Sequence, residues 1–243
     1  MSRHQLLLLD ALQTVKPMDL AGEVTKNLVS EASASGTLFR LQSQMRLLGG
    51  DDYISYVGDV FAGKNPPPRD NFGTYDLQFF GSFNEMKKAI TALDENPEIK
   101  LSRLVAGYGW KWISKGGKSP FDFEIEGTKL TWNRTAIDWI NSESSSKEVG
   151  SIHTVQGYDL NYAGVIVGPE LGFDKSTNKL VFHRSNYHDA KGKQNNTDGK
   201  KFTDSELLEF VGNIYRVLMT RGIRGTYVYV VDPELREYLR KFF

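Results

Sequence analysis

Apolar runs alternate with amphipathic stretches along most of the chain. Short runs rich in aliphatic, β-branched and aromatic residues predict strands at 75–80, 101–106, 164–167 and 226–231. Amphipathic stretches predict helices at 51–62, 83–93 and 203–220, the last with Thr203 or Asp204 as its cap. Strands that alternate with helices are typical of a doubly wound α/β fold, with a mostly parallel sheet and helices on both faces. We expect the last three strands to be central in that sheet.

Other segments carry weaker patterns. The run QLLLL at 5–9 is apolar on both faces and predicts a buried strand, which we expect to lie apart from the main sheet. A short strand is predicted at 38–41, and further helices at 20–30 and 233–242. Hairpins or edge strands are predicted at 121–126 and 172–183. Loops are predicted at 64–72, which holds three consecutive prolines, and at 189–201, which is polar and glycine-rich.

The composition is ordinary for a soluble globular protein, with 40% hydrophobic and 25% charged residues among 243. No apolar run reaches the roughly 20 residues of a membrane span, so no membrane contact is expected. The absence of cysteine excludes disulfides and thiolate metal sites, and the four histidines lack ligand spacing, so no metal site is expected. These features favour a cytoplasmic protein. Basic and acidic residues both number 30, which argues against strong autonomous nucleic-acid binding but leaves room for a narrow groove.

One segment imitates a phosphate-binding loop. Residues 116–119 read GGKS, but the full pattern needs a further glycine five positions before the second one, and Trp112 stands there. Pro120 and a strand-like segment follow, where the motif requires a long helix. We interpret this segment as a flexible basic loop.

The block IHTVQGYD at 152–159 places polar side chains beside apolar strands. Ile152 is strand-like, and His153, Thr154 and Gln156 follow it before the chain turns at Gly157. Because ligands of open α/β sheets bind at the carboxyl ends of the strands, these side chains are predicted to face a crevice. An alternative stays open, in which Thr154 caps a helix and His153 is a satisfied core histidine. Burial of polar residues between two core strands nevertheless costs free energy, which argues against this alternative.

A second block, NIYRVLMTRGIRG at 213–225, places three arginines near the end of a long helix. Cations in a last helical turn suit the helix dipole, and this structural role is our interpretation of Arg216 and Arg224. Arg221 differs because it stands before a glycine, where the chain bends toward the crevice. A guanidinium held there could bind a phosphoryl group with two parallel hydrogen bonds, as an arginine finger does.

Three earlier residues are further candidates. Arg46 lies in LQSQMR after the strand predicted at 38–41, and a plain surface charge is the alternative for a lone arginine. Asp10 and Gln13 follow the run at 5–9 and could hydrogen-bond a γ-phosphate or its attacking water. For Asp10 the alternative is an ordinary turn at the end of a strand.

The segment Gly107–Trp112 (GYGWKW) alternates aromatic residues with a lysine. Aromatic rings beside a basic group can stack on unpaired bases. Trp110 and Trp112 could also share one face of a strand and pack in the core, which is the interpretation we favour.

Taken together, these segments resemble the helicase domain of bacterial proteins of the Schlafen group-3 type, a branch of superfamily 1. The resemblance runs in order along nearly the whole chain. The segment from Asp10 to Gln13 resembles motif III, whose glutamine senses the γ-phosphate, and Arg46 falls on the arginine of motif IV. AGYGWKW resembles the segment that follows motif IV.

The two remaining motifs are the most specific. IHTVQGYDLNYAGVIVG resembles motif V, and YRVLMTRGIRG resembles motif VI, with Arg221 at the position of the finger. Asp159 falls where many relatives place an acidic residue near the nucleotide ribose, and the resemblance implies that Gln156 and Gly157 also lie toward the nucleotide. His153, Thr154 and Trp110 are the candidates for nucleic-acid contact. By this interpretation Arg221 would serve turnover and contribute little to stability.

The resemblance implies a fold of the RecA-like, P-loop NTPase type and a division of the chain. Residues 1–35 would be a remnant of a first motor lobe, and residues 36–243 the second RecA-like lobe. ATP and Mg²⁺ would be held mainly by a missing N-terminal lobe, whose phosphate-binding loop and acidic motif we expect before Asp10. The partners would be that lobe and DNA or RNA. This chain alone is expected to bind no cofactor and to be inactive as an ATPase.

Two other functions remain open at this point. One is a nucleotide-gated nucleic-acid-binding or regulatory module that does not unwind anything. The other is a degenerate domain kept for protein contacts, against which the intact arginines argue.

Overall fold

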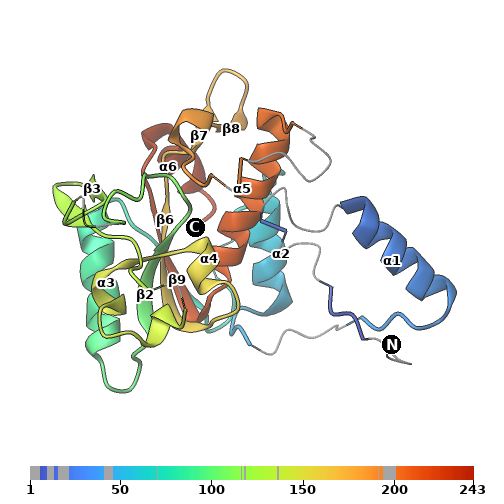
Figure 1. Cartoon of the computed structure of the whole chain (residues 1–243), viewed down its shortest axis with the longest axis horizontal. Helices are drawn as coiled ribbons and strands as arrows, with labels where there is room; N and C mark the ends of the chain where they lie inside the picture. The colour runs from blue at the N-terminus through green and yellow to red at the C-terminus, as the bar shows by residue number, and fades with distance from the viewer. Residues whose placement is uncertain are drawn as a thin grey trace.

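The computed structural model describes most of the chain and gives it an α/β architecture. The described residues are 6–9, 14–15, 22–40, 46–69, 71–115, 117, 119–135, 137–190, 192–193 and 201–243. Figure 1 shows a central sheet with helices on either side of it.

The central sheet has five strands, all parallel. Their order is β1–β9–β6–β2–β5. The strands are β1 (Asp76–Phe79), β2 (Ser102–Ala106), β5 (Val149–Ser151), β6 (Leu160–Val167) and β9 (Gly222–Val230). The three strands expected to be central, now β2, β6 and β9, are the central ones, so this prediction is confirmed.

Alternate residues of these strands face two separate hydrophobic clusters, as the two-residue period of a strand requires. In β6, Val165 and Val167 belong to one cluster and Ile166 to the other. In β9, Val228 and Tyr229 divide in the same way. Both faces of the sheet are therefore buried, which explains why these strands read as continuous apolar runs.

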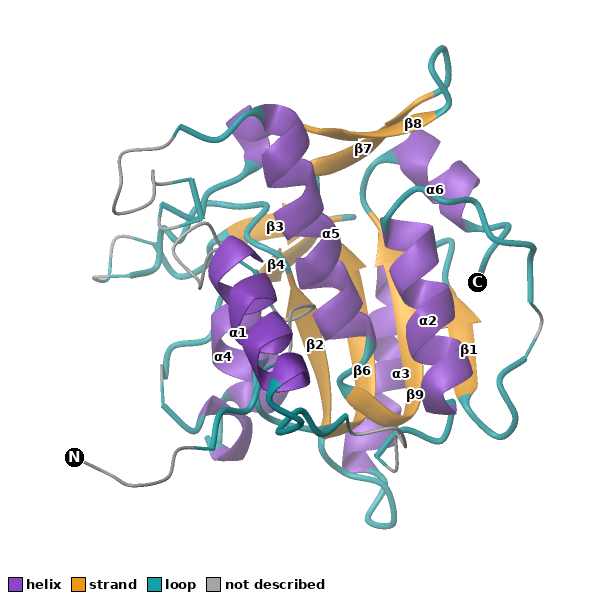
Figure 2. Ribbon diagram, turned by 90° about the vertical axis from the view of Figure 1, so that its right-hand side faces the viewer, coloured by secondary structure: helices purple, strands orange, loops and turns teal. Residues whose placement is uncertain are grey.

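Helices cover both faces. Figure 2 shows α2 (Gly50–Phe61) and α5 (Asp204–Met219) in front of the sheet and α3 (Phe83–Glu95) behind it. The buried residues of α2 and α5 belong to the cluster of Val165, and those of α3 to the cluster of Ile166. All three helices occur where the sequence predicts them. Thr203 caps α5 by accepting a hydrogen bond from the Glu206 amide, while the Glu206 carboxylate accepts one from the Thr203 amide.

Small elements complete the body. The hairpins expected from the sequence are β3 (Phe123–Ile125) with β4 (Thr128–Leu130), and β7 (Leu171–Asp174) with β8 (Lys179–Phe182). The remaining short elements are η2 (Trp139–Asn141), η3 (Ser145–Lys147), α4 (Ile152–Val155), η4 (Arg184–Asn186) and α6 (Pro233–Leu239). Ile152 was expected to be strand-like, but it begins α4, directly after β5. Most of the loop predicted at 189–201 lies outside the described residues.

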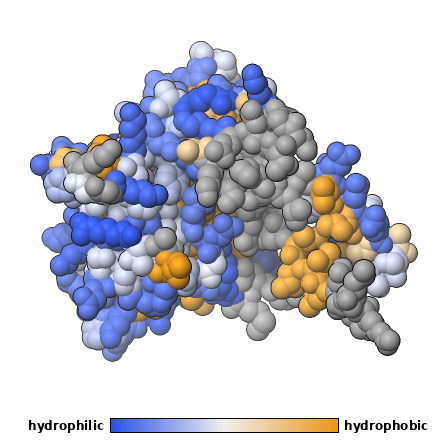
Figure 3. Space-filling view, viewed as in Figure 1, coloured by the Kyte–Doolittle hydropathy of each residue, from blue (hydrophilic) through white to orange (hydrophobic). Residues whose placement is uncertain are grey.

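The N-terminal part departs from the sequence prediction. Residues 6–9 form no strand and are exposed, Leu6 and Leu8 by 85% each, so the prediction of a buried strand is wrong for them. Residues 38–40 form no strand either, and Phe39 is 87% exposed. Helix α1 (Gly22–Ala34) has no buried residue among 23–34 and stands away from the body in Figure 1. Figure 3 shows exposed apolar surface, in orange, on the side of the molecule where α1 lies.

Candidate functional site

Strands β6 and β9 begin side by side, and their amino ends form the first candidate site. Leu160 pairs with Gly222 in the parallel register, and the Leu160 amide donates a hydrogen bond of 2.9 Å to the Arg221 carbonyl. The residues just before the two strands therefore meet at the amino edge of the sheet. They are Tyr158 and Asp159 on one side and Arg221 on the other.

Arg221 is buried at this edge, with 3% of its surface exposed. It follows Thr220, the C-terminal cap of α5. Its Nε donates to the Val217 carbonyl at 3.0 Å, and its Nη1 donates to the Tyr158 carbonyl at 3.4 Å. The guanidinium is thus packed between the last turn of α5 and the turn that precedes β6.

Arg46 reaches the same turn from a different part of the chain. Its Nε lies 3.2 Å from Asp159 Oδ1, and both side chains are about a third exposed, at 36% and 35%. The segment after Arg46 is attached to β9, because the Leu48 amide donates to the Ile223 carbonyl at 3.0 Å. The structure thus brings Arg46 and Arg221 to one turn.

Gln156 and Gly157 open that turn. Gln156 ends α4, and its amide donates to the Ile152 carbonyl at 3.0 Å. Gly157 has a φ of 92°, which L side chains rarely adopt, although nothing would crowd a side chain there. Glycine is needed at this position for its backbone freedom, which lets the chain turn toward Asp159.

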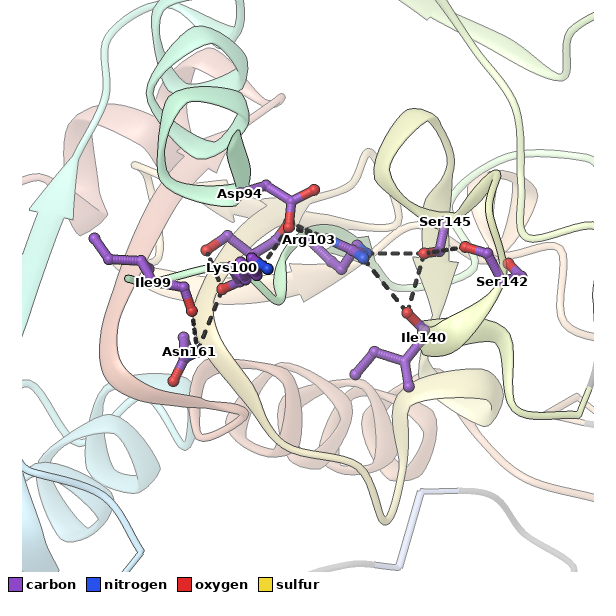
Figure 4. Close-up of polar contacts among 9 residues, drawn as sticks. Asp94, Ile99, Lys100, Arg103, Ile140, Ser142, Ser145 and Asn161 are labelled. Atoms are coloured by element: carbon purple, nitrogen blue, oxygen red, sulfur yellow. Dashed lines mark hydrogen bonds and ion pairs between the residues drawn. The ribbon is translucent and has the colours of Figure 1, made fainter. Parts of the chain in front are cut away.

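The turn is also anchored on its far side by Asn161 (Figure 4). The Asn161 amide donates to the Leu101 carbonyl at 2.9 Å, and its side-chain amide donates to the carbonyls of Ile99 and Lys100. Lys100 and Leu101 are both non-glycine residues in the left-handed region, with φ of 52° and 44°. Backbone of this kind persists only where its surroundings hold it, and Asn161 supplies that hold.

A buried arginine next to this anchor has a structural role. Arg103 forms an ion pair with Asp94 at the end of α3. Its Nε donates to Ser145 Oγ at 3.0 Å, and its Nη2 donates to the Ile140 carbonyl at 3.4 Å (Figure 4). This network fastens the segment of η2 and η3 to the amino end of β2.

The polar residues of α4 lie at the opposite, carboxyl edge of the sheet. His153 Nε2 lies 2.7 Å from Oδ2 of the buried Asp189, and the Tyr108 ring lies 5.4 Å from the imidazole. Thr154 is buried, and its hydroxyl is 2.9 Å from that of Ser151. The sequence placed the whole 152–159 block at the carboxyl ends. The structure divides it, with His153 and Thr154 near that edge and Asp159 at the amino edge.

Positive charge gathers near His188. Burial lowers the pKa of His188, and the cations Lys193 and Lys111 lower it further, so the three groups lie close together. The His188 amide donates to the Tyr108 carbonyl at 2.7 Å. A half-buried tyrosine beside these cations has the composition of a surface for single-stranded nucleic acid.

Trp110 is partly buried rather than presented. Its ring stacks on Phe123 with centroids 4.3 Å apart and planes within 10°, and Trp132 lies 6.3 Å away. This packing is the core role favoured by the sequence. Trp112 also packs against this cluster, with Lys115 Nζ 5.2 Å above its ring.

A fully buried carboxyl group lies behind the carboxyl edge. Tyr215 of α5 donates its hydroxyl hydrogen to Glu170 Oε1, and the Gly168 amide donates to the Tyr215 hydroxyl at 2.8 Å. Burial raises the pKa of Glu170 to about 7, and the hydrogen bond from Tyr215 offsets this only in part. Sequence reasoning missed Glu170, although one charged residue in the apolar stretch GVIVGPELGF was a signal for it.

The remaining candidates of the sequence are placed as follows. Asp10 and Gln13 lie outside the described residues, but the neighbouring Thr14 carbonyl accepts a hydrogen bond of 3.0 Å from Asn213 of α5. Val15 is buried in the cluster that α2 and α5 cover. Arg216 lies in the last turn of α5, as expected. Arg224 does not belong to a helix end, because it is an exposed residue of β9.

Neither a metal site nor a membrane-spanning helix is found among the described residues. No group of three or more histidine, aspartate or glutamate side chains in this part of the chain is arranged to hold a metal ion. No helix that the structure describes is long and apolar enough to span a membrane.

Comparison with known proteins gives one family and one relative. Residues 1–232 match the family described as Schlafen group 3, DNA/RNA helicase domain. The chain is 29% identical over 223 residues to the uncharacterized protein YPL245W of Saccharomyces cerevisiae. This alignment covers 83% of the chain and 47% of the yeast protein, so the chain spans about half the length of that relative. No solved structure matches the chain.

Proposed function

We propose that this chain, which belongs to the Schlafen group 3 DNA/RNA helicase domain family, is the second RecA-like lobe of an ATP-dependent helicase or translocase. The observation that carries the proposal is the meeting of Arg46 and Arg221 at the turn before β6. Two arginines beside one turn suit the recognition of a phosphoryl group.

The division of labour follows from the two edges of the sheet. Arg46, Arg221 and Asp159 would face ATP at the amino edge, with the two arginines toward the γ-phosphate. At this edge ATP and its Mg²⁺ would bring the phosphoryl chemistry, and the arginines would bind and orient the nucleotide. His153 and the cations around His188 would hold DNA or RNA at the carboxyl edge.

Arg46 and Arg221 differ in how far each is exposed to a bound nucleotide. Arg46 is about a third exposed, and its ion pair with Asp159 is one that solvent can reach. Arg221 is almost fully buried and donates to two backbone carbonyls. Its role as a finger would therefore require the turn at 157–159 to yield when nucleotide binds.

The N-terminal part of the chain would belong to the other lobe. Residues 1–35 would be a part of the first, ATP-binding lobe, and residues 36–243 the second lobe. The exposed leucines at 6–9 support this, since a run of such apolar residues in water is what a strand without its sheet would leave. By this proposal Gln13 would act from the first lobe, next to the anchoring contact between Thr14 and Asn213.

ATP turnover of the full-length protein, with and without single-stranded DNA or RNA, tests the proposal. Stimulated turnover that is lost in Arg46→Ala and in Arg221→Lys is the expected result. Turnover with neither strand separation on a forked duplex nor movement along a single strand would favour the alternative, a nucleotide-gated binding module. Stimulated turnover by residues 1–243 alone would overturn the proposal, because these residues hold no phosphate cradle.

A further inference from the structure

Glu170 makes an unusual contact with the loop that carries Tyr108. Its carboxyl group is fully buried, and only Oε1 has a hydrogen-bond partner outside its own backbone among the described residues, the Tyr215 hydroxyl. Tyr215 is itself fixed, because its ring stacks on Phe61 at 5.6 Å. The carboxyl is thus held still at the ends of β2 and β6.

Three glycines surround this carboxyl. A Cβ atom at Gly107 would lie 2.5 Å from Oε1, and Cβ atoms at Gly109 and Gly168 would lie 2.2 Å and 2.3 Å from Oε2. These distances are far below van der Waals contact, so no other residue could keep this arrangement. Gly107 and Gly109 flank Tyr108, and the backbone of the loop therefore rests directly on Glu170.

The Tyr108 side chain leaves this loop on the other side. Its ring stacks on Trp132 with centroids 5.5 Å apart and planes within 28°, and it lies 5.4 Å from the His153 ring. Its carbonyl is held by the His188 amide. Glu170 therefore contacts the backbone of the same three-residue loop whose central side chain, Tyr108, lies beside His153.

We propose that Glu170 is a positioning residue for Tyr108: its buried carboxyl supports the Gly107–Gly109 loop and so sets the position of the Tyr108 ring, which would contact single-stranded nucleic acid beside His153. This inference rests on the proposed function and assigns one residue contact within it. Ionisation of Glu170 would place a charge without a counterion against the loop backbone and displace it.

The groups that face Glu170 favour its neutral form. Tyr215 faces it from α5 and Tyr187 from the segment after η4, with Asp189 beyond Tyr187. Burial raises the pKa of both tyrosines, and the charge of Glu170 raises each further. None of these groups is a cation, and with its pKa raised to about 7 Glu170 changes charge near neutrality.

The test compares the wild-type chain with Glu170→Gln, which keeps the shape and cannot ionise. The probe is a fluorescein-labelled oligothymidine, measured by anisotropy at pH 6 and pH 8 at constant ionic strength. If only the neutral form presents Tyr108, a pKa of about 7 makes the wild-type dissociation constant rise about tenfold over this interval. Glu170→Gln should lose this tenfold component.

Tyr108→Leu provides the matched control. It should bind weakly at both pH values, and adding Glu170→Gln to it should change nothing further. Equal pH dependence in wild type and Glu170→Gln would overturn the inference while leaving nucleic-acid binding intact. Absence of binding at any pH, by the full-length protein as well as by this chain, would count against the proposed function instead.

A second measurement tests Glu170 without nucleic acid. The amide resonances of Gly107 and Gly109 should shift with a midpoint near pH 7 in the wild type and stay constant in Glu170→Gln. Resonances that do not move in the wild type would overturn the positioning role, whatever the binding result.

Discussion

Arg46 and Asp159 form an ion pair, with 3.2 Å between Nε and Oδ1, that joins the segment before α2 to the turn before β6. Arg221 meets the same turn from α5 through the carbonyl of Tyr158. Three distant segments of the chain thus converge at the amino ends of β6 and β9. This convergence gives the first predictions.

Arg46→Ala should separate stability from turnover. Because the ion pair is about a third exposed, we expect the free energy of unfolding to fall by no more than about 1 kcal/mol. Urea denaturation of the chain measures this. Arg69→Ala, which removes the comparable exposed pair with Asp52, is the control for stability and should leave the turnover of the full-length protein unchanged. A large loss of stability in Arg46→Ala alone would mean that the pair is structural.

Arg221→Ala should lower both stability and turnover. The sequence led us to expect almost no effect on stability, but a buried guanidinium that donates to two backbone carbonyls changes that expectation. Loss of these bonds should cost about 1–3 kcal/mol in urea denaturation. Turnover of the full-length protein should fall by about 10³-fold or more.

Arg224→Ala is the matched control for Arg221→Ala. Arg224 is exposed in β9, so its removal should change the free energy of unfolding by no more than about 0.5 kcal/mol. Equal losses of turnover in the two variants would contradict a special role of Arg221.

Glu170 should make the chain less stable as the pH rises. In the unfolded chain its carboxyl titrates near the usual value of 4.5, while in the folded chain its pKa is about 7. Between these values the folded state holds a proton that the unfolded state has lost, so the free energy of unfolding decreases by up to about 3 kcal/mol. Relative to wild type, Glu170→Gln should gain stability from pH 4 to pH 8, measured by urea denaturation at each pH.

Asp174 provides a control for this pH dependence, because folding lowers its pKa whereas folding raises the pKa of Glu170. Hydrogen bonds from Ser176 and Thr177 lower the pKa of Asp174 to about 2. The stability that these hydrogen bonds give the folded state is therefore present at pH values above the usual pKa of 3.8, and it is lost as the pH falls through 2. Asp174→Asn should leave the slope between pH 5 and pH 8 unchanged, and a change there would undermine the assignment of that slope to Glu170.

Gly109→Ala should destabilise the chain, because the added Cβ would lie 2.2 Å from Glu170 Oε2 and 2.7 Å from Pro169 Cδ. We expect a loss of about 1–3 kcal/mol, as for overpacked interiors. Gly81→Ala is the control, since its Cβ would only reach ordinary contact at 3.5 Å from Arg240. In a double-mutant cycle, shortening Glu170 to alanine should recover part of the loss. Full additivity would mean that the two residues do not touch in solution.

Much of the fold could be predicted because both faces of the sheet are covered. The central strands are apolar throughout, and α5 carries a capping box that the sequence displays directly. The prediction for residues 6–9 was wrong because an apolar run indicates a buried strand but does not indicate which part of the protein would cover it. The role of Asn161, which holds the left-handed backbone of Lys100 and Leu101, depends on contacts between distant segments and leaves no local pattern.

The candidate site was predictable in part. The motif residues Arg46, Asp159 and Arg221 were named from the sequence, and the structure gathers them at one turn. The division of the 152–159 block between the two edges of the sheet could not be predicted. Helix α4 is only one turn long, and the chain then runs back along the sheet to the start of β6. The buried state of Arg221 could not be foreseen either, because it depends on the Tyr158 carbonyl.

Strand β6 has a mechanical consequence. Its 8 residues run from the turn of Asp159 to the turn of Glu170, a span of roughly 25 Å at the rise of an extended strand. It is hydrogen-bonded to β2 and β9 on its two sides and buried on both faces, so it can neither stretch nor bend by much. A displacement of the turn at Asp159 is therefore expected to move the sheet together with the turn at Glu170.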